Sequence, residues 1–267
     1  MNYLQVIILG IIQGITEWLP ISSQAMVFLF SRLFFDLGHI EALGVSIWLH
    51  SGTLVAAVIY FRKDILRILT NISQKDSSSK KLFLFLVLST LISGIIAIPL
   101  LLFVFLVEFP KSLFTIIIGL LLVIIAFLQK KSKELKIGER ALKSLKNQDS
   151  LIVGLIQGFS ALPGFSRSGS TIATLLFLRY SLKDAFYLSF LMSIPIVFLA
   201  QIALPLIQKE FIITLPLLFG ALISGLVGFI SIKVLLEFAK KVNFFKTTLI
   251  LGLIVIFFGT ILLFLNY

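Results

Sequence analysis

The chain of 267 residues contains no cysteine and few charged side chains. Without cysteine it has no disulfide bonds, cysteine-ligated metals or thiol nucleophiles. Charged residues make up 13% of the chain and apolar residues 59%, whereas soluble domains carry about 25% charged residues. The mean hydropathy is +1.12. Because so few polar groups cannot cover a soluble fold of this length, we expect membrane lipids to form part of its solvent.

Acidic residues are the scarcer charged type: 12 Asp and Glu stand against 23 Lys and Arg, and the net charge is +11. Most basic residues lie in three gaps between apolar runs, at 62–81, 130–149 and 233–246. Basic loops of this kind orient membrane proteins, because they stay in the cytoplasm. The charge excess therefore predicts three cytoplasmic segments rather than a nucleic acid partner.

Six apolar stretches are long enough for transmembrane helices, which need about 20 residues each. We expect these spans near 43–61, 82–107, 112–129, 184–207, 211–232 and 247–265. With the basic gaps in the cytoplasm, the number of spans puts both termini outside. The sequence thus predicts a multi-pass protein of the cell membrane.

Two further apolar segments, 3–35 and 151–180, are interrupted by Pro, Gly and Ser. Their sequences align, since LGIIQG in the first matches VGLIQG in the second, which indicates an internal repeat. Each copy precedes three spans, and because three is odd, the second copy begins on the opposite side of the membrane. Interrupted helices are tolerated at membrane depth where protein or water surrounds them.

The expected fold is therefore all-α, with six transmembrane helices plus two re-entrant helical hairpins in an inverted-topology repeat. In such proteins the site lies near the bilayer midplane, where the repeats meet. The expected organisation is a first repeat at 1–129, a basic cytoplasmic linker at 130–149 and an inverted second repeat at 150–267.

Glu17 and Arg167 are the ionisable residues that lie deep inside apolar sequence, each beside the interruption of its segment. A charge within the bilayer is costly and is a functional candidate by default. A purely structural ion pair is one alternative. Another is that the small residues nearby only permit close helix packing.

The second interrupted segment is rich in groups that bind phosphate. A guanidinium makes bidentate contacts to phosphate, and helix N-termini and glycine-flanked backbone N–H groups bind its oxygens. The chain lacks the GxxxxGK[ST] and GxGxxG motifs of common nucleotide sites. The predicted phosphate-binding residues around Arg167 are Gly164, Ser166, Ser168, Gly169, Ser170 and Thr171.

The first interrupted segment supplies complementary groups. Gln13 and Glu17 are one helical turn apart, and Ser22 and Ser23 follow. A carboxylate near a hydroxyl can act as a general base, or can hold a divalent cation that bridges to phosphate. We therefore predict Glu17, Ser23 and Arg167 as catalytic residues, with Glu17 also the candidate metal ligand. His50 is either a further substrate contact or a packing histidine.

The motifs QGITEWLPISS and LPGFSRSGSTI, with LHSGTLVA between them, resemble the integral-membrane undecaprenyl-diphosphate phosphatase family associated with bacitracin resistance. The resemblance covers essentially the whole chain. It implies hydrolysis of a long-chain prenyl diphosphate lipid to the monophosphate, which recycles the carrier for cell-envelope glycan synthesis. It also implies stimulation by a divalent cation such as Mg²⁺ or Ca²⁺ and a site open toward the outer face. It leaves open whether two copies form a homodimer.

The motifs of this family fall on the candidate residues. Its (E/Q)xxxE pair falls on Gln13 and Glu17, and its next serine on Ser23. Its PGxSRSGxT positions fall on Pro163, Gly164, Ser166, Arg167, Ser168, Gly169 and Thr171.

One position departs from the family pattern, because Met26 stands where many members have a histidine with a catalytic role. Either the reaction does not need that imidazole, or His50 supplies one, or this chain is a divergent homologue with a changed substrate or weak activity. The first option is favoured, since the leaving group is itself a phosphate of low basicity. A prenyl-phosphate transporter is the alternative from another functional class.

Overall fold

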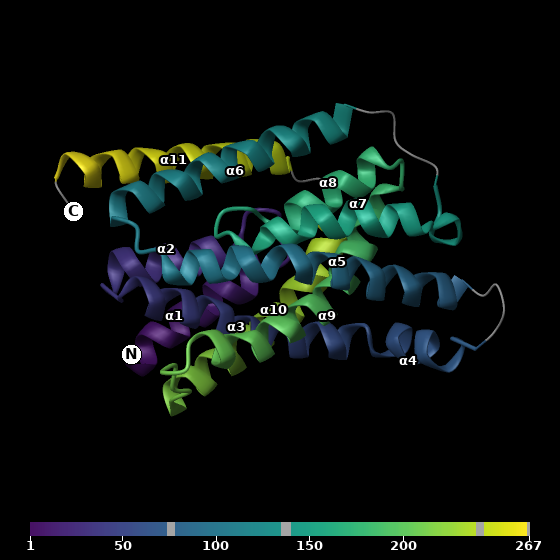
Figure 1. Cartoon of the computed structure of the whole chain (residues 1–267), viewed down its shortest axis with the longest axis horizontal. Coiled ribbons are helices and arrows are strands. Elements are labelled where there is room, and N and C mark those ends of the chain that lie inside the picture. The colour runs from purple at the N-terminus through teal and green to yellow at the C-terminus, as the bar shows by residue number, and fades with distance from the viewer. Residues whose placement is uncertain (74–77, 135–139, 239–242, 266–267) are drawn as a thin grey trace.

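The structure is a computed structural model that describes residues 1–73, 78–134, 140–238 and 243–265. The described residues form α-helices joined by turns and short 3₁₀ segments (Figure 1). The α-helices are α1 Tyr3–Thr16, α2 Ser23–Phe34, α3 His39–Tyr60, α4 Arg62–Thr70, α5 Ser78–Leu106, α6 Lys111–Glu134, α7 Asn147–Gly158, α8 Arg167–Phe177, α9 Leu182–Ile207, α10 Leu215–Phe238 and α11 Phe244–Phe264.

Six of these helices, α3, α5, α6, α9, α10 and α11, are long and apolar enough to cross a membrane. The prediction of six spans is confirmed, and the protein is a multi-pass membrane protein. Helix ends differ from the predicted span ends by a few residues, and α6 continues to Glu134, inside the predicted linker. The reason is that an apolar run measures the lipid-facing part of a helix, whereas the helix itself continues into polar sequence.

The two interrupted segments each form two short helices. α1 has 14 residues and α2 has 12, while α7 has 12 and α8 has 11. At about 1.5 Å per residue, none of them reaches across a hydrocarbon core of about 30 Å. Positive φ angles mark both interruptions, 65° at Ser22 and 102° at Gly164. At Gly164 an added Cβ would also lie 2.8 Å from the Ile118 carbonyl oxygen, so this turn requires glycine.

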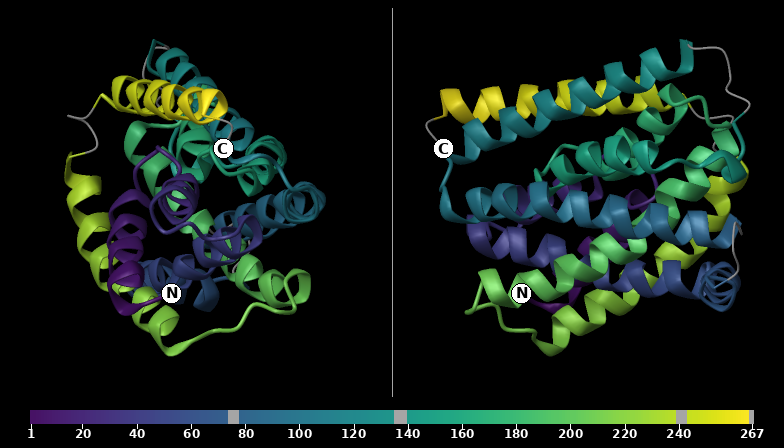
Figure 2. Two further views of the ribbon diagram at one scale, coloured as in Figure 1. Left: turned by 90° about the vertical axis from the view of Figure 1, so that its left-hand side faces the viewer. Right: turned by 45° about the vertical axis from the view of Figure 1, so that its right-hand side comes forward.

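The short helices pack against long helices of the other half of the chain. α1 packs along α10, and α7 packs along α5. Glycines allow both close approaches: a Cβ on Gly14 would lie 2.8 Å from the Gly228 nitrogen, and one on Gly154 would lie 2.7 Å from the Ser89 carbonyl oxygen. α6 and α11 lie side by side along one flank, α8 packs between α6 and α9, and α2 packs on α1 and α3 (Figures 1 and 2).

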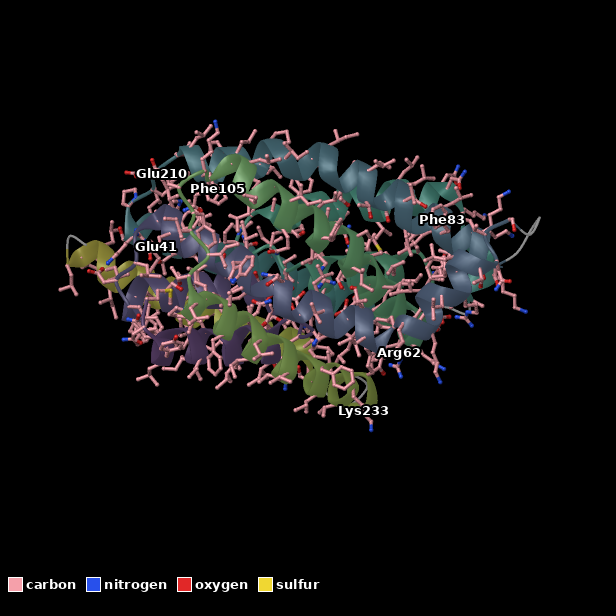
Figure 3. All side chains as sticks on the ribbon, turned by 90° about the horizontal axis from the view of Figure 1, so that it is seen from below. Glu41, Arg62, Phe83, Phe105, Glu210 and Lys233 are labelled. Carbon is pink, nitrogen blue, oxygen red and sulfur yellow. The ribbon has the colours of Figure 1, made fainter. Side chains whose placement is uncertain are left out.

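Charged residues mark the two ends of the bundle. Glu41 and Glu210 lie at the same end as Phe105 in Figure 3, and Arg62 and Lys233 lie toward the opposite end. Because α5 begins at Ser78 and α9 at Leu182, both near the basic end, these two helices run in the same direction.

A buried cluster fastens the segment before α7 to the segment after α8. The Arg140 guanidinium donates to both carboxylate oxygens of Asp149, at 3.1 and 2.7 Å, and the Tyr180 hydroxyl donates to Asp149 Oδ2 at 2.7 Å. Burial alone would raise the pKa of Asp149, but the hydrogen bonds from Arg140 and Tyr180 hold it below its ordinary value. Burial, together with the hydrogen bond to Asp149, raises the pKa of Tyr180. The cluster is therefore charged at neutral pH and holds the start of α7 in place.

Replacing Asp149 tests this cluster. Asp149→Asn leaves the Arg140 guanidinium without its counter-ion and is expected to lower the free energy of unfolding in detergent by about 1.5–3 kcal/mol. Glu41→Gln, at an exposed carboxylate, is the matched control. Since the folded-state pKa of Asp149 is lowered, its contribution is present above the unfolded pKa of about 3.9 and is lost as the pH falls through the folded-state pKa. Equal stability of Asp149→Asn and wild type at pH 7 would contradict the assignment.

Candidate active site

Glu17 lies at the turn between α1 and α2, where hydrogen bonds hold its backbone and its carboxylate. Glu17 is the C-cap of α1, and its backbone N–H donates to the Gln13 carbonyl oxygen. Its Oε2 accepts from Gln13 Nε2 at 2.8 Å and from Ser23 Oγ at 2.7 Å. Only 4% of Glu17 is exposed. The carboxylate is therefore aimed at the first residue of α2.

Arg167, the first residue of α8, completes the pair expected from the sequence. Its Nη2 lies 2.5 Å from Glu17 Oε1, and its Nη1 donates to the Ser189 carbonyl oxygen at 3.0 Å. The side chain of Arg167 is 12% exposed and that of Glu17 is 3% exposed. The two charges that stand alone in apolar sequence thus neutralise each other across 150 residues of chain.

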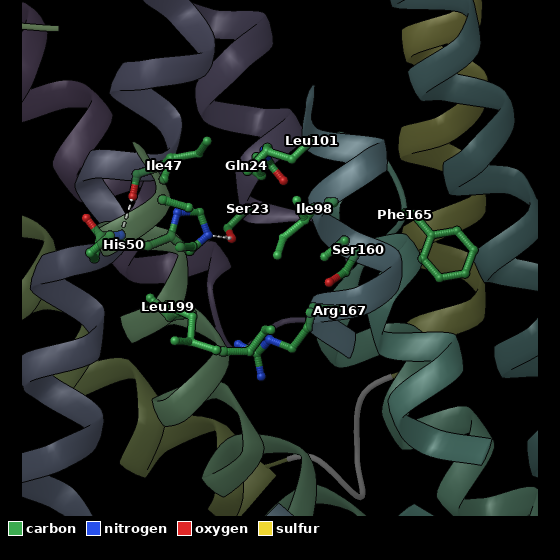
Figure 4. Close-up of a pocket in the computed structure, with 18 of the residues that line it drawn as sticks. Ser23, Gln24, Ile47, His50, Ile98, Leu101, Ser160, Phe165, Arg167 and Leu199 are labelled. Atoms are coloured by element: carbon green, nitrogen blue, oxygen red, sulfur yellow. Dashed lines mark hydrogen bonds between the residues drawn. The ribbon is translucent and has the colours of Figure 1, made fainter. Parts of the chain in front are cut away.

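His50 lies at the same carboxylate. Its Nε2 is 3.1 Å from Glu17 Oε2 and 3.3 Å from Ser23 Oγ (Figure 4). Its Nδ1 is 2.6 Å from the Ser46 carbonyl oxygen. A carbonyl can only accept, so Nδ1 carries a hydrogen and Nε2 is the ring atom that faces Ser23 and Glu17. Of the three ways to account for Met26, this geometry favours the one in which His50 supplies the imidazole.

These groups line a cavity of about 340 Å³. Figure 4 shows Ser23, His50 and Arg167 turned toward the same space, with Ile98, Leu101 and Leu199 around it. The polar wall comes from the two interrupted segments and from α3, and the apolar wall comes from α5 and α9. Such a cavity suits a ligand with a charged head and a hydrocarbon body.

Two helix N-termini face this cavity. Ser22, Ser23 and Gln24 at the start of α2 line it, as do Ser166 and Ser168 at the start of α8. Ser166 is the N-cap of α8, and its Oγ accepts from the Gly169 N–H at 3.1 Å. Helix N-termini carry partial positive charge and bind anions. Together with the Arg167 guanidinium they make the polar wall a site for an anion.

The other predicted residues lie behind this wall. Gln13 does not line the cavity but donates to Glu17. The Gly164 N–H donates to Ser22 Oγ at 3.2 Å, which joins the two interruptions. Ser170 and Thr171 donate to the Arg167 carbonyl oxygen. Gly164, Gly169, Ser170 and Thr171 therefore hold the start of α8 rather than contact a ligand in the cavity.

Three features of the site escaped sequence reasoning. Gln24 and Ser160 line the cavity, yet no spacing in the sequence singles them out. Gln201 also lines it, and its Nε2 donates to the Ile47 carbonyl oxygen at 2.8 Å. The start of α2, by contrast, has a signal in the sequence, because serine is common where helices begin and Ser22 and Ser23 come shortly after Pro20.

The donor set does not fit a resident divalent cation. Among the residues that the structure describes, no group of three His, Asp or Glu could hold a metal ion. Glu17 is the one carboxylate that lines the cavity. Arg167 occupies its Oε1, while Gln13, Ser23 and His50 surround its Oε2. Glu17 alone therefore provides too few ligands for a metal centre, and both of its oxygens already accept hydrogen bonds from neighbouring side chains.

The fold and the cavity define a class: a multi-pass membrane protein with a buried ion pair and a cavity at the junction of two interrupted helical segments. Comparison with known proteins identifies the family. The family model described as "Bacitracin resistance protein BacA" matches residues 6–264. The chain belongs to this family.

Curated relatives are similar to this chain over nearly their whole length. A protein of Methanococcoides burtonii named undecaprenyl-diphosphatase is 40% identical over 248 residues, which are 90% of this chain and 92% of the relative. A protein with the same name from Sulfurisphaera tokodaii is 35% identical over 94% of this chain and 95% of the relative. Another from Saccharolobus solfataricus is 34% identical over 97% of this chain and 96% of the relative.

The Glu17–Arg167 pair can be tested as an energetic unit. Glu17→Gln or Arg167→Met alone leaves one buried charge unpaired, and each is expected to lower the free energy of unfolding by about 3–5 kcal/mol. The double variant removes both charges and should lose clearly less than the two single losses together. Unfolding in detergent, followed by circular dichroism, measures the three values. Strictly additive losses would mean that the two side chains do not interact.

Proposed function

We propose that this protein hydrolyses a long-chain prenyl diphosphate of the undecaprenyl type to the monophosphate and inorganic phosphate. The product is the lipid carrier of cell-envelope glycan synthesis, and its recycling accounts for bacitracin resistance. The names of the relatives support the substrate class. The observation that carries the proposal is the contact of one hydroxyl, Ser23, with both Glu17 and His50, beside Arg167 in an apolar-walled cavity.

The diphosphate binds where positive charge gathers. The charges of Glu17 and Arg167 cancel, so the remaining attraction comes from the N-termini of α2 and α8 and from the outer edge of the Arg167 guanidinium. Charges in such an enclosed site act in a low dielectric and are preorganised. Ser22, Ser166 and Ser168 add hydroxyls at the same wall.

His50 handles the proton. With its Nδ1–H held by the Ser46 carbonyl, an Nε2 without a hydrogen accepts the proton of Ser23 once this hydroxyl turns from Glu17 Oε2, or the proton of a water in its place. The imidazolium that forms lies 3.1 Å from Glu17 Oε2, so the new charge arises beside a carboxylate. Glu17 therefore holds Ser23 before the reaction and stabilises the protonated histidine that forms.

The oxygen freed of its proton attacks the terminal phosphorus. A bond forms from that oxygen to phosphorus, the bond from phosphorus to the bridging oxygen breaks, and its electron pair leaves on the prenyl monophosphate. Arg167 and the N–H groups of α8 offset the charge that develops. If Ser23 attacks, a water activated by His50 then releases inorganic phosphate; if water attacks, release is direct.

A divalent cation enters this proposal only as a companion of the substrate. Mg²⁺ or Ca²⁺, expected from the resemblance, binds diphosphate oxygens readily. Because the donor set around Glu17 does not fit a resident ion, the steps above are assigned to side chains of this chain alone.

We further propose that the interrupted segments are re-entrant hairpins of an inverted repeat. Matching contacts support this arrangement: Gly10 packs on Gly220 and Ile223 of α10, and Gly154 packs on Ser89 and Ile92 of α5 with the same spacing. The repeats are 1–129 and 150–267, joined by the basic segment 130–149. Both termini lie outside, and the cavity opens toward the end that carries Glu41 and Glu210, the outer face.

Exchange of the histidine tests the mechanism. His50→Ala is expected to lower the release of phosphate from undecaprenyl diphosphate by about 10²–10⁴-fold, the usual contribution of a general base. Arg167→Met should be at least as severe. Met26→His combined with His50→Ala should recover part of the lost rate, because residue 26 follows Ser23 by three residues on α2 and so lies on the same side of that helix. Wild-type turnover by either His50→Ala or Arg167→Met in purified protein would refute the assignment.

Introduced cysteines test the orientation, because the chain has none of its own. Lys63→Cys on α4 and Lys209→Cys after α9 are both at exposed positions. A membrane-impermeant maleimide added to intact cells should label Lys209→Cys and not Lys63→Cys. Permeabilised cells, in which both should be labelled, are the control. The reverse pattern would invert the proposed topology.

A further inference from the structure

Long helices from opposite halves of the chain meet along two seams, α3 with α10 and α5 with α9. The two seams differ in how closely the helices pack. At the α3–α10 seam the backbones are in contact: a Cβ on Gly52 would overlap the Ala221 carbonyl oxygen and lie 2.7 Å from the Gly225 nitrogen. Ser224 Oγ also donates to the Leu49 carbonyl oxygen at 2.9 Å. The two helices are therefore closely packed along this seam.

The α5–α9 seam is open. A Cβ added to Gly94 of α5 would meet no atom within 4 Å. On one side of this point lies the active-site cavity, and on the other lies a second cavity of about 360 Å³. The second cavity is lined by side chains of α4, α5 and α9, among them Val87, Thr90, Leu91, Ile194, Phe198 and Leu199.

Gly94 and Gly225 hold corresponding places in their helices. Gly154 packs on Ser89, five residues before Gly94, and Gly10 packs on Gly220, five residues before Gly225. A Cβ added to Gly225 would lie 3.0 Å from the Gly52 carbonyl oxygen, whereas a Cβ added to Gly94 would meet no atom within 4 Å. The same scaffold is therefore closed on one side and left open on the other, so the opening is a property of the α5–α9 side chains.

The second cavity lies next to the active-site cavity. Leu199 lines both cavities, and on α5 the second ends at Leu91, one turn before Gly94, which lines the first. Figure 4 shows Leu199 beside Arg167 at the edge of the active-site cavity.

The second cavity suits hydrocarbon and little else. Thr90 is the one polar residue in its wall, and apolar cavities of this kind exclude water. Leu91 and Phe198 are 59% and 55% exposed on the lipid-facing side, so a chain can enter from the bilayer without unfolding the bundle.

We infer that the second cavity binds the prenyl chain of the substrate, which passes between Gly94 and Leu199 while the diphosphate lies against Arg167. This inference rests on the proposed function. A head held near the midplane leaves only about 15 Å of hydrocarbon above it, half of the core thickness. An eleven-unit chain is longer than that, and the second cavity, which lies toward the basic end of α5 and α9, offers it an apolar path into the other half of the bilayer.

Chain length provides the test. Thr90→Phe fills the cavity from α5, and Val87→Phe fills it from the more exposed rim and disturbs less packing. Both are expected to raise KM for undecaprenyl diphosphate about ten-fold while changing KM for farnesyl diphosphate, with three isoprene units, less than two-fold. Ile95→Phe, at a position on α5 that is 72% exposed and outside both cavities, is the matched control. Equal effects on both substrates, or no effect on the long one, would overturn the inference.

A binding measurement separates this inference from the proposed function. Ile194→Cys places a thiol in the cavity wall, and Ile95→Cys places one toward lipid. Undecaprenyl diphosphate should slow labelling of Ile194→Cys by an apolar maleimide at least five-fold, farnesyl diphosphate should not, and Ile95→Cys should be unaffected. Protection without phosphate release would support the chain site and refute the hydrolase. Labelling that is blocked by phospholipid and unchanged by either diphosphate would assign the cavity to phospholipid and overturn the inference.

Discussion

The ion pair between Glu17 and Arg167 is the interaction on which the rest depends. Each charge alone would be costly at this depth, and each comes from a different half of the chain. Their contact requires the two interruptions to meet, which fixes where α2 and α8 begin. Because the pair is neutral, the positive helix ends beside it stay available to an anion. The same contact thus serves the assembly of the halves and the charge of the cavity.

The interrupted backbone needs its own support. Pro20 follows the end of α1, and its carbonyl oxygen accepts from Gln129 of α6 at 2.8 Å and from Thr248 of α11 at 3.2 Å. The Gly164 N–H donates to Ser22. The α6–α11 pair, which lies along one flank and contributes nothing to the cavity wall, therefore satisfies groups that lipid could not.

The sequence predicted what depends on local pattern. Span length, the Pro and Gly interruptions and the isolated charges identified the six long helices, the two broken segments and the meeting of Glu17 with Arg167. It could not decide the role of His50, because a histidine on an apolar helix gains its meaning from the neighbours that tertiary packing supplies. For the same reason the Arg140–Asp149 cluster was missed, and Gly169, Ser170 and Thr171 proved to support α8 behind the wall. The divalent-cation expectation rested on the resemblance and on Glu17 beside a hydroxyl, and local sequence could not show that Gln13, Ser23, His50 and Arg167 surround this carboxylate.

The imidazole and the serine hydroxyl come from different helices. Ser23 is on a short helix inside the bundle, whereas His50 is on α3, a helix long enough to cross a membrane. On a single helix the distance between the two groups would follow from helix geometry alone. Here it is set by tertiary packing, of α2 on α3 and of α3 on α10 at Gly52, so side chains distant from the cavity determine how the two groups meet.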